Sequence, residues 1–476
     1  MPDPNPFLLL ERNARDDPRG LFLRTADDSI TNADAVILAK QIAFELRRLG
    51  LAAGDVVAID LPDRLGALFT WAVYHEAAIS TVLPPGTRPD AAVPVRWLVS
   101  NHESAQHGDA RSVHVDARFL QLVSENPYGI RPSEAAVDTL RIVFSSGTTG
   151  TPKAMAMGRH LERVFGAALP SWFAGGPVLS LMDLGTAAGI GELYLAVTAG
   201  QPYLCAGGAA PAEIIRLIRS AEVATLKGSP HKILALLDEL EAEGGTLPSL
   251  TTVAISGTSM PAAAAERLRR SAPGCTVRIN YGSTEAGGAT SRRDASDDPA
   301  DVGHPVPGTV LEIVDDRDQP VDPGTEGWIR YRSPGMAHGY LGDPEASARA
   351  FRDGWFHPGD RGVLRADGGL TLRTRTTDLL NAGGIKVDAA RIDHVAQQVA
   401  GVVDAASFDV GTASGLREIA LAVVVDGAFD TETLLESLRA EFGHAAPTVV
   451  ARMDAIPRTA TGKPLRRVLS DRLSAG

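Results

Sequence analysis

Cysteine, aromatic residues and long apolar runs are all scarce in this chain of 476 residues. Its two cysteines, Cys205 and Cys275, lie in apolar or glycine-rich surroundings, so we expect packing roles in a reduced, cytoplasmic setting. No segment approaches the roughly 20 apolar residues that a membrane-spanning helix requires. The apolar run at residues 7–10 is too short for a signal sequence, and no basic residue precedes it. We therefore predict a soluble protein without membrane insertion.

An excess of positive charge is missing as well. The 46 lysines and arginines are outnumbered by 58 aspartates and glutamates, which leaves a formal charge of −12. This balance argues against nucleic acid as a partner. A chain of this length also exceeds what one hydrophobic core usually organises, so two or more domains are expected.

Helical and strand patterns alternate over the first two thirds of the chain, which favours layered α/β sheets. One apolar helical stripe begins after Thr31 or Asn32 and ends at Gly50, residue types that cap helices. The glycine-rich stretches 257–258 and 281–285 follow predicted strands, and ligands of α/β sheets bind at such places. The predicted elements are helices at 35–49 and from Pro211, and strands at 55–60, 251–256 and 276–280.

The pattern changes after about residue 300. Short alternating runs at 310–314, 327–332, 362–365 and 370–373 predict a β-rich region. The last hundred residues combine a predicted strand at 419–425 with an amphipathic helix at 431–442, which favours an α+β arrangement.

A stretch rich in hydroxyl groups and glycine follows the predicted strand 140–144. Hydroxyls and exposed backbone N–H groups bind polyphosphates, and glycine lets the backbone approach them closely. Lys153 adds a mobile positive charge. Pro152 before this lysine excludes a Walker A loop, and a flexible surface loop is the alternative. The stretch consists of Ser145, Ser146, Gly147, Thr148, Thr149, Gly150, Thr151, Pro152 and Lys153.

This stretch resembles the phosphate loop of the adenylate-forming enzymes, which include acyl-CoA synthetases, adenylation domains of peptide synthetases and luciferases. The resemblance extends over nearly the whole chain and is greatest to acyl-CoA synthetases. Four further segments match the family in its order, namely 280–285, 354–360, Arg375 before Asp378, and 457–463.

The resemblance implies a large N-terminal domain of layered α/β sheets at residues 1–374, with a β-rich subdomain at about 300–374. A hinge at 375–377 and a small, mobile α+β domain at 378–476 would follow. It also implies ATP-dependent activation of a carboxylic acid to an acyl-adenylate, followed by thioester formation. Such chemistry depends on positioning and on charge neutralisation.

Each requirement of this chemistry has a candidate at a matching position. Residues 145–150 and Lys153 would hold the β- and γ-phosphates of ATP, Thr284 would contact the α-phosphate, and Glu285 would hold Mg²⁺. Lys463 would enter with the mobile domain for adenylation and leave for thiol attack. Taken alone, Glu285 is also compatible with a solvated carboxylate.

The nucleoside has its own candidates. Tyr281, flanked by Asn280 and Gly282, would stack on adenine beside the backbone of Gly257 and Thr258. Asp360, with Arg375, would bind the ribose hydroxyls by charge-assisted hydrogen bonds. Core packing is the alternative for Tyr281, and an ordinary turn is the alternative for Asp360.

The thiol acceptor is indicated by residues 381–386, which resemble the acyl-CoA synthetase loop that lies against pantetheine. Gly383 and Gly384 would let the backbone approach that slender chain, and a tight hairpin turn is the alternative. The implied partners are a carboxylic acid and either CoA or the pantetheine of a carrier protein. A homodimer is compatible with the sequence.

Three departures from the family pattern stand out. Thr377 replaces an acidic or lysine hinge residue, Pro358 replaces a threonine near the nucleotide, and Thr186 replaces a histidine or aromatic gate. Small residues at 185–191 and 287–290 suggest room for a bulky, rigid, apolar acid, with close helix packing as the alternative. Ala187 and Ala188 cannot pair with an ammonium group, so an amino-acid substrate is disfavoured.

We predict an acyl-CoA synthetase, with secondary metabolism as its expected setting. Two related alternatives are a ligase that loads a carrier protein and an enzyme specialised for one half-reaction. A non-catalytic nucleotide- or acyl-binding relative is the alternative of a different class.

Overall fold

The fold is that of a computed structural model of the chain. It describes residues 5–83, 93–103, 105–145, 153–158, 176–206, 208–256, 260, 262–293, 298, 300–375, 379–382, 385–411, 417–427, 429–443, 446–459 and 462–474.

The N-terminal part contains a six-stranded sheet within the described residues, in the order β6–β5–β3–β4–β7–β8. Its neighbouring strands pair in parallel, except that β8 is antiparallel to β7. The strands are β3 (Val56–Asp60), β4 (Ile79–Thr81), β5 (Val95–Ser100), β6 (Arg111–His114), β7 (Thr139–Phe144) and β8 (Ala154–Gly158), and the helices are α1 (Phe7–Asp16), α2 (Asn32–Leu49), α3 (Asp63–His75) and α4 (Ala117–Ser124).

Helix α2 begins and ends where its capping residues predict. The side-chain hydroxyl of Thr31 accepts a hydrogen bond from the backbone N–H of Asp34, and Gly50 adopts the left-handed conformation with φ of 104°. Both residues help to satisfy backbone groups that the helix itself leaves unpaired.

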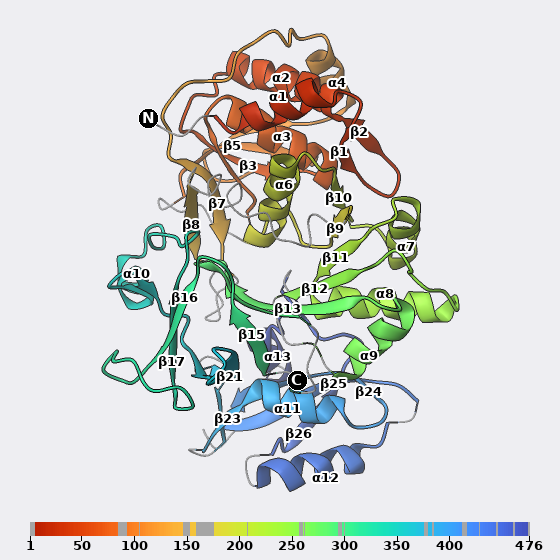
Figure 1. The fold of residues 1–476 in the computed structure, drawn as a ribbon, viewed down its shortest axis with the longest axis vertical. Coiled ribbons are helices and arrows are strands. Elements are labelled where there is room, and N and C mark those ends of the chain that lie inside the picture. Colours follow the sequence, from red (N-terminus) through yellow and green to blue (C-terminus); the bar gives the residue numbers. More distant parts are fainter. Residues whose placement is uncertain are drawn as a thin grey trace.

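A second, larger sheet continues the α/β arrangement (Figure 1). Strands β10, β9, β11, β12 and β13 pair in parallel in that order, with β1 and β2 added at the β10 edge. The strands are β1 (Leu21–Arg24), β2 (Ser29–Thr31), β9 (Val178–Ser180), β10 (Tyr203–Cys205), β11 (Thr225–Gly228), β12 (Thr252–Ser256) and β13 (Thr276–Ser283), and the helices are α6 (Ala187–Ala199), α7 (Pro211–Ser220), α8 (Pro230–Ala242) and α9 (Ala262–Ser271).

Strand β13 links this parallel sheet to a β-rich region. It pairs in parallel with β12 on one side and antiparallel with β14 on the other. The remaining elements of this region are β14 (Gly287–Arg293), β15 (Asp301–Pro305), β16 (Val310–Val314), β17 (Glu326–Arg332), α10 (Pro344–Ala350), β18 (Phe351–Arg352), β19 (Trp355–Phe356), β20 (Asp360–Leu364) and β21 (Leu370–Arg375).

One sequence prediction is wrong at this link. We expected a strand to end at Asn280 and a turn to cover 281–285, but β13 runs through Ser283, and only Thr284, Glu285 and Ala286 form the turn. The strand continues because Tyr281 lies opposite Thr290, and Ser283 lies opposite Gly287. This pairing is with residues later in the chain, so the local glycine pattern could not reveal it.

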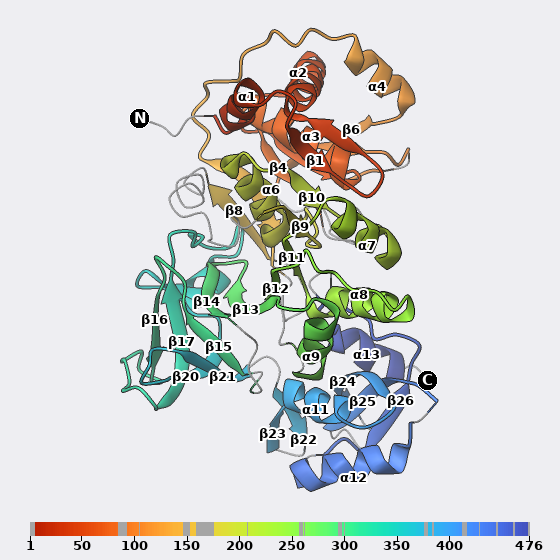
Figure 2. The same cartoon turned by 45° about the vertical axis from the view of Figure 1, so that its right-hand side comes forward.

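The C-terminal part has its own sheets and its own hydrophobic clusters. Figures 1 and 2 show it beyond α9, at the end of the molecule opposite α1 and α2. Its two buried apolar clusters draw only on residues from Leu380 onward. The elements are β22 (Leu379–Ala382), β23 (Ile385–Asp388), α11 (Ala389–Gln397), β24 (Val402–Gly411), β25 (Arg417–Val425), α12 (Thr431–Phe442), β26 (Val449–Arg452) and α13 (Arg466–Ser474).

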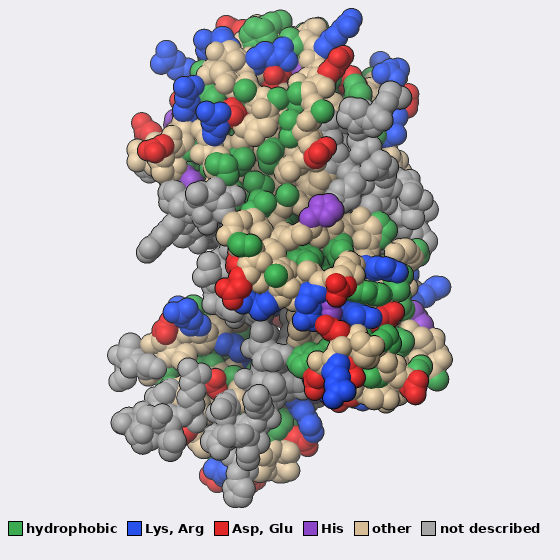
Figure 3. Space-filling view, turned by 90° about the vertical axis from the view of Figure 1, so that its left-hand side faces the viewer, with side chains coloured by type: hydrophobic (Ala, Val, Ile, Leu, Met, Phe, Trp, Pro, Cys, Tyr) green, Lys and Arg blue, Asp and Glu red, His purple; other side chains and the backbone are tan. Residues whose placement is uncertain are grey.

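Acidic and basic side chains lie intermixed on the described part of one face of the molecule. On the face that Figure 3 shows, Lys and Arg side chains occur close to Asp and Glu side chains at both ends of the molecule. Exposed pairs of opposite charge contribute little to stability, because water screens their attraction. The charge on this face is thus mixed rather than gathered in one region of one sign.

The predicted mixed α/β fold is confirmed. The predicted hinge at 375–377 falls largely outside the described residues, so the domain boundaries stay a prediction. Among the described helices, none combines the length and apolar character needed to cross a membrane.

Candidate active site

The predicted phosphate loop connects two paired strands. Phe144, the last residue of β7, lies opposite Ala154, the first residue of β8, and the backbone N–H of Ser145 donates to the carbonyl of Lys153 at 2.9 Å. The two ends of the loop are therefore held together. Its central residues, Ser146, Gly147, Thr148, Thr149, Gly150, Thr151 and Pro152, lie outside the described part of the chain.

A buried arginine, Arg141, fixes strand β7. Its side chain is 2% exposed, and its Nη atoms donate to the hydroxyl of Ser80 at 3.0 Å and to the carbonyl of Leu184 at 2.7 Å. Burial lowers the pKa of Arg141. Sequence reasoning missed this residue, although a single charge inside the apolar run 140–144 was a signal that could have found it.

The turn between β13 and β14 carries Thr284 and Glu285. The hydroxyl of Ser333 donates to the carbonyl of Ala286 at 2.6 Å, and the hydroxyls of Ser283 and Tyr331 lie 2.9 Å apart. A Cβ atom on Gly282 would lie 2.3 Å from the carbonyl oxygen of Gly287. Only glycine fits there, because the two strand backbones approach so closely.

The segment 337–341 joins this turn to the base of the phosphate loop. The backbone N–H of Ala337 donates to the carbonyl of Glu285 at 2.8 Å, and that of Leu341 donates to the carbonyl of Ala154 at 2.8 Å. This short segment therefore connects the backbone of Glu285 to the backbone of Ala154, the residue that follows Lys153.

Tyr340, within this segment, contacts both candidate residues through its side chain. Its hydroxyl donates to Oε1 of Glu285 at 3.0 Å, and the ammonium of Lys153 lies 4.7 Å from its ring centroid. Burial and the adjacent Glu285 raise the pKa of Tyr340, so the hydroxyl keeps its proton and acts as a donor. The sequence offered no pattern that singled out Tyr340.

The structure places three of the nucleoside candidates, Tyr281, Asp360 and Arg375, close together. The hydroxyl of Tyr281 donates to Oδ2 of Asp360 at 2.5 Å, and these side chains are 8% and 3% exposed. Asp360 begins β20 and lies opposite Arg375 of β21 in the strand register. Asp360 is thus a buried strand residue, which contradicts its interpretation as an ordinary turn residue.

Tyr281 belongs to the core and to the candidate site at once. It is part of the apolar cluster of the β-rich region, together with Ala289 and Leu370. The packing alternative from the sequence therefore holds for the ring, and the hydroxyl contact with Asp360 comes in addition. Asn280, the preceding residue, lies opposite Ser291 in the ladder between β13 and β14.

Glu285 is suited to a hard metal ion. It is half-buried, and among the described residues its carboxylate accepts one hydrogen bond, from Tyr340, and has no cationic partner. No group of three or more potential metal-ligating side chains occurs in the described residues. Mg²⁺ commonly uses one or two carboxylates together with substrate phosphates, so a single glutamate fits it.

Lys463 lies in a short hairpin of the C-terminal part. Its N–H donates to the hydroxyl of Thr459 at 3.1 Å, and its carbonyl accepts from the N–H of Thr459 at 2.8 Å. Arg458 anchors the hairpin to β24 by an ion pair with Asp404 at 2.6 Å. The approach of Lys463 to the phosphate loop stays a prediction.

Several other candidates lie outside the described residues. They are Gly257, Thr258, Thr377, Gly383 and Gly384, together with Asp378. Gly383 and Gly384 separate the paired strands β22 and β23, whose residues Ala382 and Ile385 lie opposite each other.

Thr186, at the expected gate position, caps helix α6. Its hydroxyl accepts from the N–H of Gly189 at 3.0 Å and donates to the carbonyl of Asp183 at 2.7 Å. A Cβ on Gly189 would lie 2.0 Å from that same carbonyl oxygen. Close packing at the start of the helix therefore explains part of the small-residue stretch.

Gly191 of the same helix lines a small cavity of about 20 Å³, with Ile190, Tyr194 and Arg141 among its walls. Such a volume holds about one water molecule. Within the described residues, this cavity does not accommodate a bulky acid.

The arrangement is that of a nucleotide-dependent enzyme. Three separate chain segments assemble a lysine at the base of a phosphate-loop hairpin, a carboxylate suited to a metal ion, and a buried aspartate beside an aromatic ring. This combination suits charge neutralisation on a polyphosphate and hydrogen bonding to a sugar.

Comparison with known proteins identifies the family. Residues 10–341 match the AMP-binding enzyme family, and the chain belongs to it. The chain is 27% identical to the medium/long-chain-fatty-acid–[acyl-carrier-protein] ligase FadD10 of Mycobacterium tuberculosis, over 98% of this chain and 95% of that protein. It is 26% identical to a feruloyl-CoA synthase of Amycolatopsis sp, over 96% of each chain.

A third relative is the 2-hydroxy-7-methoxy-5-methyl-1-naphthoate–CoA ligase of Streptomyces carzinostaticus, 26% identical over 98% of this chain and 92% of that protein. The fold is similar to that of ATP-bound MatB from Rhodopseudomonas palustris, with a TM-score of 0.84 at 22% identity over 100% and 99% of the two chains. The predicted membership of the adenylate-forming enzymes is confirmed, and the chain is an AMP-forming acid–thiol ligase.

Proposed function

We propose that this enzyme couples ATP cleavage to activation of a bulky, apolar carboxylic acid and passes the acyl group to CoA. In the first half-reaction a carboxylate oxygen bonds to the α-phosphorus of ATP, and pyrophosphate leaves. In the second, a thiol attacks the acyl carbon, and AMP leaves with the bonding electron pair. The main support for the proposal is that the side chain of Tyr340 contacts both Lys153, which precedes β8, and Glu285, in the turn between β13 and β14.

The roles that we propose for the chain's own residues follow from their charges and hydrogen-bonding groups. The ammonium of Lys153 would neutralise the departing phosphates, and Thr284 would contact the α-phosphate from the β13–β14 turn. Asp360 and Arg375 would hold the ribose, and Tyr281 would orient Asp360 through the 2.5 Å hydrogen bond. Lys463 would supply the second cation where negative charge accumulates in the transition state.

Mg²⁺ would be held by Glu285, whose second carboxylate oxygen accepts no hydrogen bond among the described residues. When bound, the ion would neutralise charge on the phosphates and fix their orientation.

Different observations support the proposed thiol acceptor and the proposed carboxylic acid. One relative is named as a CoA synthase, one as a CoA ligase and one as a ligase for an acyl carrier protein, so pantetheine of either kind is the acceptor class that we propose. We favour CoA because residues 381–386 resemble the loop of acyl-CoA synthetases. The feruloyl and naphthoate relatives act on ring-containing acids by name, which favours the bulky acid predicted from small residues. A cytoplasmic location and a role in secondary metabolism remain predictions.

An exchange experiment tests this function. Purified enzyme with ATP and Mg²⁺ is given labelled pyrophosphate and a panel of acids, and we expect acid-dependent label in ATP, highest with ring-containing acids. Mass analysis with CoA present should then find the acyl-CoA. Exchange best supported by short fatty acids would contradict the predicted acid, and acylation of a carrier protein in place of CoA would support the alternative acceptor.

A further inference from the structure

Tyr340 stands between two side chains of opposite charge. The ammonium of Lys153 lies over one face of its ring, and the carboxylate of Glu285 accepts a hydrogen bond from its hydroxyl. Within the described residues, Lys153 and Glu285 form no ion pair with each other. The tyrosine side chain therefore contacts a lysine and a glutamate of opposite charge at the same time.

The tyrosine is held in this place by its own surroundings. The hydroxyl of Ser347, in α10, accepts from the backbone N–H of Tyr340 at 2.8 Å. The ring meets that of Phe351 nearly edge to face, with centroids 5.5 Å apart. Backbone hydrogen bonds at Ala337 and Leu341 fix the segment at both ends. The position of the ring is thus determined before any ligand arrives.

Keeping Lys153 and Glu285 apart has a consequence for ligand binding. A lysine paired with a glutamate offers less positive charge to a phosphate, and that glutamate offers less negative charge to a metal ion. The face of an aromatic ring attracts a cation without cancelling its charge, so it holds Lys153 without neutralising it. The hydroxyl meanwhile donates a hydrogen bond to Oε1 of Glu285, so Oε2 is available to a ligand.

We propose that Tyr340 is a positioning residue that keeps Lys153 and Glu285 apart, so that each retains its charge for the nucleotide and its metal ion. The proposal rests on the proposed function, because it takes ATP with Mg²⁺ as the ligand. It assigns a distinct role to each half of one side chain. The hydroxyl orients the metal-binding carboxylate, and the ring holds the phosphate-binding ammonium.

The test measures ATP binding by calorimetry with no acid present, once with excess Mg²⁺ and once with EDTA. The ratio of the two affinities is the metal enhancement. Tyr340→Phe keeps the ring and removes the hydroxyl, so we expect the metal enhancement to fall about fivefold to tenfold while the affinity in EDTA stays within about twofold. Tyr340→Leu removes both halves, so both the metal enhancement and the affinity in EDTA should fall.

A double substitution distinguishes separation from simple loss of contact. If Lys153 pairs with Glu285 once the ring is gone, then Lys153→Met should lower the affinity in EDTA much less in the Tyr340→Leu background than in the wild type. It should also restore part of the metal enhancement in that background. Equal effects of Lys153→Met in both backgrounds would overturn the separating role.

Control measurements keep these outcomes apart. Tyr128→Phe makes the same chemical change at a tyrosine that is 54% exposed and outside the site, and it should match the wild type.

If Tyr340→Leu does not fold, the Tyr340→Phe comparison alone decides the role of the hydroxyl. A wild type that binds ATP with metal enhancement, together with an unchanged Tyr340→Phe, overturns this inference only. A wild type without metal-dependent ATP binding overturns the proposed function as well.

Discussion

Tyr281 illustrates how one side chain can belong both to the core and to the candidate site. Its ring is buried among apolar residues of the β-rich region, and its hydroxyl reaches the carboxylate of Asp360. A hydrogen bond from a neutral donor to a charged acceptor contributes more than a neutral pair. We therefore expect the hydroxyl to matter for the nucleotide and the ring to matter for stability.

Tyr281→Phe tests this division. We expect the KM for ATP in pyrophosphate exchange to rise about tenfold, equivalent to about 1.4 kcal/mol, with kcat changed little. The effect should shrink with 2′-deoxy-ATP or 3′-deoxy-ATP, whichever lacks the hydroxyl that Asp360 binds. An equal loss with ATP and with both analogues would instead assign the hydroxyl to packing.

At this scale the sequence singled out residues inside motifs and overlooked residues between them. It selected Asp360 and Tyr281 because they belong to recognisable segments, and the structure joins the two by a hydrogen bond. Tyr340 and Arg141 were missed because their contacts come from neighbours distant in sequence, such as Glu285 for Tyr340 and Ser80 for Arg141.

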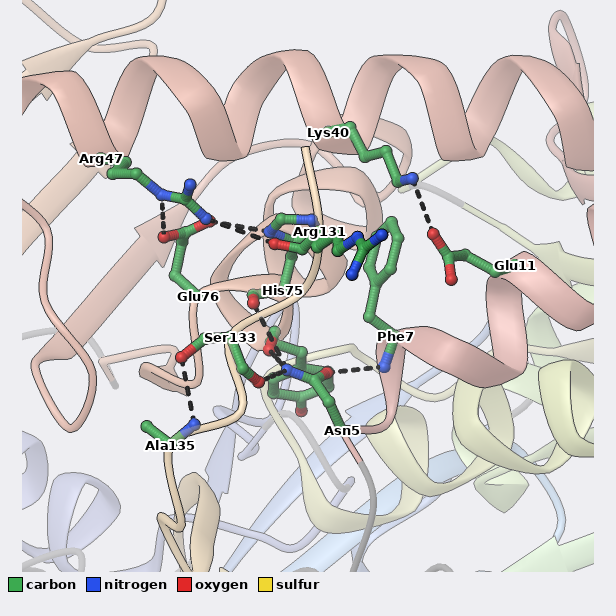
Figure 4. A network of polar contacts seen from close by, with 11 residues as sticks. Asn5, Phe7, Glu11, Lys40, Arg47, His75, Glu76, Arg131, Ser133 and Ala135 are labelled. Atoms are coloured by element: carbon green, nitrogen blue, oxygen red, sulfur yellow. Dashed lines mark hydrogen bonds and ion pairs between the residues drawn. The ribbon is translucent and has the colours of Figure 1, made fainter. Parts of the chain in front are cut away.

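At the scale of elements, the contact between α2 and α3 shows how a polar network can organise a buried junction (Figure 4). Arg47 of α2 binds the carboxylate of Glu76 through two nitrogens, at 2.8 and 2.9 Å, and Nδ1 of His75 lies 2.7 Å from the same carboxylate. Asn5 donates to the carbonyls of Tyr74 and Ser133, which brings the start of the described chain to the same junction.

Glu76→Gln tests the charge in this network. Burial alone would raise the pKa of Glu76, but hydrogen bonds from His75 and Arg47 outweigh it and lower the pKa below its ordinary value of 4.5. A carboxyl whose pKa is lower in the folded state stabilises the fold above the unfolded pKa, and this contribution is lost as pH falls through the folded pKa. We expect the variant to be about 2 kcal/mol less stable at about pH 7, and this difference to shrink once the pH falls below the ordinary pKa of 4.5.

Native-state hydrogen exchange of peptides from α2 and α3 at increasing urea measures this local stability. Glu345→Gln is the matched control, because Glu345 pairs with Arg349 but its side chain is 82% exposed. Exposed pairs contribute little, so this variant should match the wild type at both pH values. A Glu76→Gln difference that persists at low pH would contradict a role for the charge.

Element ends were predicted well where the signal is local. The caps of α2 at Thr31 and Gly50 are examples, and α12 spans the predicted residues 431–442. The end of β13 was predicted wrongly because Gly282 and the residues around it are typical of a turn. The partner strand β14 overrides that preference.

At the scale of the whole molecule, the C-terminal part carries Lys463 on a hairpin that is fixed to its own core. The Arg458–Asp404 ion pair holds this hairpin against β24, and the hydrogen bonds between Thr459 and Lys463 close the hairpin itself. If the C-terminal part rotates, the lysine moves with it as one unit.

Lys463→Ala tests whether that unit serves one half-reaction. We expect acyl-adenylate formation to fall by about a hundredfold or more, because a preorganised cation near the transition state is removed. Thioester formation from supplied acyl-adenylate should stay within about threefold of the wild type, because we expect the cation to be withdrawn for that step. Arg467→Ala, on the exposed face of α13, is the control. Similar losses in both half-reactions would show that Lys463 does not act selectively.

The large-scale organisation was only partly accessible from the sequence. The order of the motifs predicted the family and the mixed α/β fold. The continuous path from the parallel strands through β13 into the antiparallel region was not predicted, because composition records no pairing between distant segments.

That continuous path has a mechanical consequence. From Arg278 to Asn280, β13 pairs with β12 on one flank and with β14 on the other. Moving one region against the other would have to break the β12–β13 ladder or the β13–β14 ladder, so these regions should behave as a single stiff frame. The part of the candidate site around Tyr281 would then keep its shape throughout turnover, and backbone amides at 278–280 should exchange slowly with or without nucleotide.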